Sequence, residues 1–176
     1  PYTTVEGCLF NNLTGGGVIF SSGAGGIVSN CRMDSGNVGA YISENCTMEL
    51  IDCDIRNSIW ACVQVTFSTL RGSGNILHGG SYYTIGVSSA RLDFHGNHIM
   101  PGTDYSVKMI GYNIPDAGVD LTGNYWGTDD SAELDSWIWD GNDDPSLQAV
   151  VQYEPFSAVP LPAETKTMGD IKNMFR

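Results

Sequence analysis

Phe94-His-Gly-Asn-His-Ile99 is one of six short segments that share a single pattern along this chain of 176 residues. Each segment has an apolar residue, any residue, a small or polar residue, then Cys or Asn, any residue and an apolar residue. The segments begin at Val5, Val28, Leu50, Gly72, Phe94 and Leu121, and only the one at Gly72 lacks the first apolar residue. Recurrence of this kind is the signature of a solenoid, in which each repeat packs on its neighbours.

The Cys or Asn at the fourth position serves as a marker of the period. The markers are Cys8, Cys31, Cys53, Asn75, Asn97 and Asn124, separated by 23, 22, 22, 22 and 27 residues. Two residues after the marker stand Phe10, Met33, Ile55, Leu77, Ile99 and Trp126, and ten residues after it stand Val18, Tyr41, Val63, Ile85, Val107 and Leu134. A period near 22 residues is too short for a strand–helix–strand unit, and alternation such as Val63-Gln-Val65 is typical of strands. The sequence therefore predicts an all-β parallel solenoid of about six coils.

The marker position has a physical explanation. An inward Asn can hydrogen-bond the Asn of the coils above and below, and it tolerates the left-handed backbone of a sharp corner, where a preceding Gly adds freedom. Cys8, Cys31 and Cys53 fill the same slot as small buried residues. Parallel neighbours keep their Cβ atoms about 4.8 Å apart, farther than the roughly 3.8 Å of a disulfide, so we expect stacked thiols.

The last third of the chain departs from the period, and we interpret it as a cap. The sequence predicts a short helix that begins at Asp130 or Ser131 and has Leu134, Trp137 and Ile138 at helical spacing. We further expect a turn at 140–145, a final strand at 149–156 and a short helix at 168–175. Residues 1–128 thus form the coils, and residues 129–176 form the cap and tail of the same domain.

Charge and hydropathy exclude some partners. The formal charge of −12 and the isoelectric point near 4.3 argue against nucleic acid and anionic membrane surfaces. No apolar run approaches the roughly 20 residues that span a bilayer, so we expect no membrane insertion. Residues 1–5 already resemble the interior of a repeat, and we expect the true N-terminus, with any signal peptide, to lie outside this sequence. An exposed first coil would permit end-to-end self-association.

A resemblance to a known family rests on three strings. Leu121-Thr-Gly-Asn-Tyr-Trp-Gly-Thr-Asp-Asp130, Ile138-Trp-Asp-Gly-Asn-Asp-Asp-Pro-Ser-Leu147 and Val151-Gln-Tyr-Glu-Pro-Phe156 are similar to the C-terminal end of right-handed parallel β-helix repeat proteins of the pectate-lyase-like superfamily. The resemblance implies a right-handed solenoid and, since many members are secreted or surface-attached bacterial and archaeal proteins, an extracellular or cell-surface location. The same fold carries enzymes, adhesins and tailspikes, so it does not define an activity.

Signatures of carbohydrate chemistry are weak in this sequence. A glycosidase needs two carboxylates across a groove. The candidates are not expected to fall into one outward column that would line a groove; they are Asp34, Glu44, Glu49, Asp52, Asp54, Asp93 and Asp104. A polygalacturonase signature is absent, and Lys108 is the sole lysine before residue 166. His78, His95 and His98 lie at different offsets and are interpreted as lone surface histidines. These observations favour a non-catalytic extracellular module, structural or binding glycans or surfaces; the alternative is a polysaccharide lyase or hydrolase, or a fragment of one.

Two groups of residues are candidate sites. Aromatic side chains can stack on sugar rings, and the candidates for contact with a polysaccharide or cell-surface glycan are Tyr82, Tyr83, Tyr105 and Tyr112. Stacking between neighbouring coils is the competing explanation. Calcium prefers several oxygen ligands from a polar turn, and its candidate ligands are Asp140, Asn142, Asp143 and Asp144. A solvated capping turn is the favoured explanation of these acids, and no other cofactor is expected.

Overall fold

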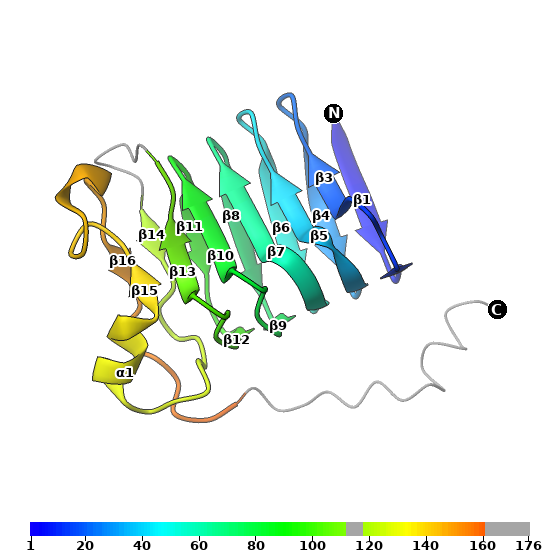
Figure 1. The fold of residues 1–176 in the computed structure, drawn as a ribbon. Helices are drawn as coiled ribbons and strands as arrows, with labels where there is room; N and C mark the ends of the chain where they lie inside the picture. Colours follow the sequence, from blue (N-terminus) through cyan, green and yellow to red (C-terminus); the bar gives the residue numbers. More distant parts are fainter. Residues whose placement is uncertain (112–117, 161–176) are drawn as a thin grey trace.

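The computed structural model describes residues 1–111 and 118–160. Its strands stack from β1 at one end to the cap with α1 (Ser131–Ser136) at the other (Figure 1). All strand pairs recorded for the described residues are parallel, which confirms the predicted all-β solenoid. The solenoid makes about five turns, slightly fewer than the expected six. Beyond Trp126 the chain forms α1 before its last strands extend the sheets.

Three faces make up the solenoid. The first is a seven-stranded sheet with the order β1 (Tyr2–Glu6), β4 (Gly25–Ser29), β6 (Thr47–Ile51), β8 (Thr69–Ser73), β11 (Arg91–Phe94), β14 (Val119–Asp120) and β16 (Val151–Gln152). The second and third faces share strands, because β5 (Arg32–Ile42) and β7 (Asp54–Thr66) run through both.

The second face is short, and the third carries longer strands. The short face consists of β2 (Leu9–Asn11), the first halves of β5 and β7, β9 (Ile76–Leu77) and β12 (His98–Ile99). The third face, called the β10 face below, consists of β3 (Gly16–Phe20), the second halves of β5 and β7, β10 (Tyr83–Ser88), β13 (Tyr105–Met109) and β15 (Ile138–Trp139).

The asparagine markers form the predicted ladder. Asn75, Asn97 and Asn124 are fully buried. The Nδ2 of Asn75 donates to Oδ1 of Asn97 at 2.8 Å, and the Nδ2 of Asn97 donates to Oδ1 of Asn124 at 3.0 Å. The backbone N–H of Cys53 continues the ladder by donating to Asn75 at 2.9 Å. The ladder satisfies buried polar groups that would otherwise destabilise the interior.

The left-handed corner lies one residue earlier than the marker. The residue that precedes each marker has φ between 52° and 73°, in the series Gly7, Asn30, Asp52, Gly74, Gly96 and Gly123. The marker itself is absent from the positive-φ residues. Our assignment of the left-handed corner to the marker was therefore wrong: the preceding residue makes the turn, which leaves the marker free to point inward.

The apolar column ten residues after the marker has two exceptions. Ala40, rather than Tyr41, aligns with Val18 and Val63 in the interior, because the pairing of β5 with β7 shifts by one residue between Gly36 and Val38. At the C-terminal end Ile138, rather than Leu134, pairs with Val107. The shift turns Tyr41 out of the core column onto the outer surface of the β10 face.

The cap agrees with the sequence in its start and differs in its length. Asp130 caps α1, with its Oδ1 accepting from the N–H groups of Ala132 and Glu133 at 2.9 and 3.3 Å. The helix ends at Ser136, so Ile138 was wrongly placed on it: pairing with β13 satisfies the backbone of β15 instead. The last strand shortens to β16, and a 3₁₀ helix, η1, spans Pro145–Leu147. The expected helix at 168–175 lies outside the described residues.

Candidate functional site

Aromatic side chains gather on and beside the β10 face. We call this group the aromatic strip; its members, all partly or largely exposed, are Tyr41, Trp60, Tyr82, Tyr83, Tyr105 and Trp139. The strip includes three of the four predicted tyrosines, and Tyr112 lies outside the described residues. Sequence reasoning missed Tyr41, Trp60 and Trp139. A signal existed for Trp60, because it precedes Tyr82 by one period of 22 residues.

Rings of neighbouring coils contact one another along the strip. Trp60 and Tyr82 stack with ring centroids 4.7 Å apart and planes inclined by 15°. Trp60 is 49% exposed and Tyr82 is 44% exposed, so both rings present area to solvent. Tyr105 and Trp139 meet at 5.7 Å and 54°. Cross-coil stacking and ligand contact are therefore compatible explanations, since the stacked rings remain about half exposed.

A shallow depression of about 350 Å³ lies among these rings. Its lining consists of Val38, Tyr41, Trp60, Gln64, Tyr83 and Ile110. The Tyr83 hydroxyl donates to Oε1 of Gln64 at 3.0 Å, and partial burial raises the pKa of Tyr83. The depression thus has apolar walls and one oriented polar pair, a composition typical of small-ligand sites.

Lys108 lies on β13, beside the C-terminal part of the strip. Its Nζ lies 5.0 Å from the centroid of the Tyr105 ring, within the range of a cation–π contact. In the register of the β10 face it lies between Gly86 and Trp139.

The carboxylates of the acidic turn accept hydrogen bonds from backbone N–H groups of the cap. Asp140 is 2% exposed, and its two carboxylate oxygens accept from the N–H groups of Asn142 and Val151, both at 2.8 Å. Asp143 accepts from the N–H of Asp140 at 3.1 Å, and Asp144 caps η1. Within residues 1–111 and 118–160, no group of three or more His, Cys, Asp or Glu side chains is arranged to hold a metal ion. The calcium site stays a prediction, and the geometry fits a hydrogen-bonded capping turn.

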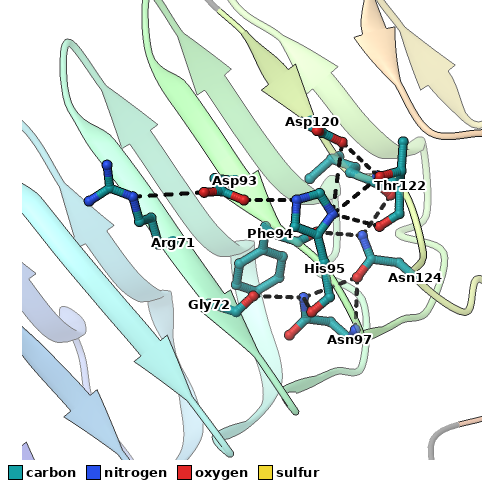
Figure 2. Close-up of polar contacts among 10 residues, drawn as sticks. Arg71, Gly72, Asp93, Phe94, His95, Asn97, Asp120, Thr122 and Asn124 are labelled. Carbon is teal, nitrogen blue, oxygen red and sulfur yellow. Dashed lines mark hydrogen bonds and ion pairs between the residues drawn. The ribbon is translucent and has the colours of Figure 1, made fainter.

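A polar network centred on His95 lies on the outer surface of the seven-stranded sheet (Figure 2). The Nε2 of His95 lies 2.8 Å from Oδ1 of Asp93, and its Nδ1 lies 2.8 Å from the carbonyl oxygen of Thr122. Asp120 approaches Nδ1 at 3.8 Å. The hydrogen bond to the Thr122 carbonyl, with the charges of Asp120 and Asp93, raises the pKa of His95 against a smaller effect of burial.

The network adds detail to the expected scatter of carboxylates and corrects the interpretation of two histidines. Glu49, Arg71, Asp93 and Asp120 follow one another in register on β6, β8, β11 and β14. Glu49 and Asp93 therefore share an outward column, because all four residues lie at equivalent positions of successive coils, but the other five candidate carboxylates do not lie in it. His95 is not a lone histidine, and neither is His78, whose Nε2 lies 3.1 Å from Oδ1 of Asp54.

Asp93 and His95 are acid–base groups that already have partners. Arg71 separates Glu49 from Asp93, with its Nε 3.8 Å from Oδ2 of Asp93. Both nitrogens of His95 already face acceptors. The depression of the aromatic strip and a polar one beside His78, bordered by Asn57, Ser81 and Thr103, lie away from this sheet. The arrangement fits a set of stabilising contacts between coils better than a reaction centre.

The fold and its marker ladder define a parallel β-solenoid. A family model described as a right-handed beta helix region matches residues 1–124, and the chain belongs to that family. Searches of curated proteins and of solved structures found no match. No helix among the described residues is both long and apolar enough to cross a membrane.

Proposed function

We propose that this chain is a non-catalytic carbohydrate-binding module of an extracellular or cell-surface protein, with the aromatic strip as its binding surface. The observation that carries the proposal is the half-exposed Trp60–Tyr82 stack beside a depression with apolar walls. Exposed aromatic rings supply large rigid contact area at low entropic cost, and sugars offer apolar C–H faces to them. The stacked coils would hold the rings at a fixed spacing.

The alternative is a polysaccharide lyase or hydrolase. A hydrolase needs two carboxylates on either side of the scissile bond. The residues that line the depression include no carboxylate, and the carboxylates of the Glu49–Asp120 column lie on a different face. These positions support binding without turnover.

The test combines a glycan array with a turnover assay. We expect the purified chain to bind at least one glycan and to release neither reducing sugar nor unsaturated uronate from polysaccharides. Trp60→Ala should weaken binding at least tenfold, about 1.4 kcal/mol, because it removes one ring of the stack. Phe67→Ala is the matched control, since Phe67 is 59% exposed but is not part of the strip. Product release, or equal affinity of the Trp60→Ala variant and the wild-type chain, would overturn the proposal.

A further inference from the structure

The depression in the aromatic strip is uncharged although the chain carries a formal charge of −12. None of the described side chains that line it is acidic or basic. The polar groups of its side chains are the phenols of Tyr41 and Tyr83, the indole N–H of Trp60 and the amide of Gln64. A ligand that carries a carboxylate or sulfate would find no cation in this lining, whereas a hydroxyl-bearing ligand would find donors and acceptors.

Most cationic side chains of the described residues lie on faces other than the β10 face. Arg32, Arg56 and Arg71 pair with aspartates on the short face and the seven-stranded sheet. Arg91 lies on β11 of the seven-stranded sheet. Lys108 lies on the β10 face, where it contacts the Tyr105 ring. Acidic ligands therefore meet one cation beside the strip and none in its depression.

A carboxylate also borders the strip. Asp104 is exposed, and its N–H donates to the carbonyl oxygen of Tyr82 at 2.9 Å, so it follows Tyr82 on the next coil. Its charge would repel an anionic sugar stacked on the Trp60–Tyr82 pair. Repulsion between exposed charges decays over roughly 10 Å at moderate salt, a range that includes the adjacent coil.

Gln64 is oriented toward the depression by its partner. Because the Tyr83 hydroxyl donates to Oε1 of Gln64, the amide nitrogen retains its N–H donors for a ligand. Gly86 makes this possible: a Cβ at that position would clash with Oε1 of Gln64 and with the Tyr83 ring. Gly86 thus acts as a positioning residue for the Gln64–Tyr83 pair.

We infer that the aromatic strip binds neutral glycans more tightly than uronate or sulfated glycans. In this inference the amide N–H of Gln64 donates a hydrogen bond to a sugar oxygen. The inference rests on the proposed function and adds the substrate class and a specificity-determining residue. A buried polar group left unpaired by the wrong ligand is a strong source of selectivity. Gln64, which is partly buried, supplies such a donor in a depression whose other lining side chains are uncharged.

The test measures affinity by calorimetry for neutral gluco-, xylo- and manno-oligosaccharides and for oligogalacturonates of equal length, at low and high salt. We expect a neutral oligosaccharide to bind at least tenfold more tightly than the uronates, with little change on adding salt. Gln64→Leu should weaken that binding about tenfold, and Gly86→Ala should do so by displacing the pair. Gln152→Leu, on the exposed surface of β16, is the matched control.

The outcomes separate the inference from the proposed function. Tighter binding of oligogalacturonates, falling with salt and in Lys108→Gln, would overturn neutral selectivity and leave carbohydrate binding intact. Neutral binding that Gln64→Leu does not weaken would overturn the role of Gln64. No binding of any oligosaccharide would overturn both proposals. Unchanged melting temperatures of the variants would show that altered affinity does not reflect unfolding.

Discussion

Asn97 is the central member of the asparagine ladder and the most informative single residue of the interior. Its Oδ1 accepts from both the side chain and the backbone N–H of Asn75, and its Nδ2 donates to Asn124. We expect Asn97→Ala to lower the free energy of unfolding by about 3 kcal/mol, because it leaves buried polar groups without partners. Chemical denaturation measures the change.

The control for this prediction is Asn11→Ala. Asn11 is exposed at the end of β2, and we expect its removal to change stability by at most about 0.5 kcal/mol. Equal effects of the two substitutions would mean that the ladder does not stabilise the interior. An effect confined to Asn97→Ala would identify the marker position as a main source of stability.

Residues at fixed offsets explain how much could be predicted from the sequence. The period, the parallel strands and the Asn75–Asn97–Asn124 ladder follow from residues that recur at fixed offsets in successive coils. Tyr41 was assigned to the core because a count along the chain cannot detect the one-residue shift between β5 and β7. The complete aromatic strip could be predicted only with knowledge of this register shift, because the shift turns Tyr41 outward.

At the scale of elements, His95 joins β11 to the segment that follows β14. A neutral imidazole has one N–H and cannot donate to both the Thr122 carbonyl and Asp93, whereas the imidazolium donates to both. The charged groups that face it are Asp93 and Asp120, with Arg71 on the far oxygen of Asp93. The geometry therefore favours the protonated ring, in agreement with its raised pKa.

The His95 contact should make stability depend on pH. Because the folded-state pKa lies above the unfolded value of about 6.5, the contribution is fully present below that value and is lost as pH rises through the folded pKa. We expect His95→Gln to cost up to about 1 kcal/mol at acidic pH, as exposed ion pairs do, and less at alkaline pH. Urea denaturation across this range measures both. A cost independent of pH would contradict the predicted role of the charge.

The sequence could not predict this contact from periodicity alone. Asp93 and His95 lie two residues apart, so strand alternation places both on the outer surface, and that part was within reach. Thr122 and Asp120 lie within the irregular interval of 27 residues between Asn97 and Asn124, where counting by 22 fails. Networks that cross an irregular coil thus require the three-dimensional register.

At the scale of the whole molecule, the three faces have different chemistry. The short face carries ion pairs such as Arg32–Asp34, the seven-stranded sheet carries the His95 network, and the β10 face carries the aromatic strip. Since the interior is filled with apolar side chains and the ladder, each outer face can vary without changing the fold. This separation is why the fold was predictable and the aromatic strip was only partly so.

Burial of the thiols reports on the integrity of the N-terminal coils, because all five cysteines lie between residues 8 and 62. All five cysteines are free; Cys8 is exposed, and the other four are buried. We expect a thiol reagent such as Ellman's reagent to modify one cysteine in the folded chain and five after denaturation. Cys8→Ser should abolish the rapid reaction. Rapid modification of more than one thiol under native conditions would contradict the packing of the interior.

The first coil is a candidate surface for self-association. In a polypeptide that begins at Pro1, β1 pairs only with β4, and Tyr2, Leu9 and Ile19 are 68%, 62% and 56% exposed at or near this end. Open strand edges with apolar side chains favour pairing with another chain. We expect sedimentation velocity to reveal association that grows with concentration and weakens in Leu9→Lys. Ile59→Lys, which alters an equally apolar side chain on β7, should leave it unchanged. A monomer at every concentration would mean that the twist and polar groups of the first coil already protect its edge.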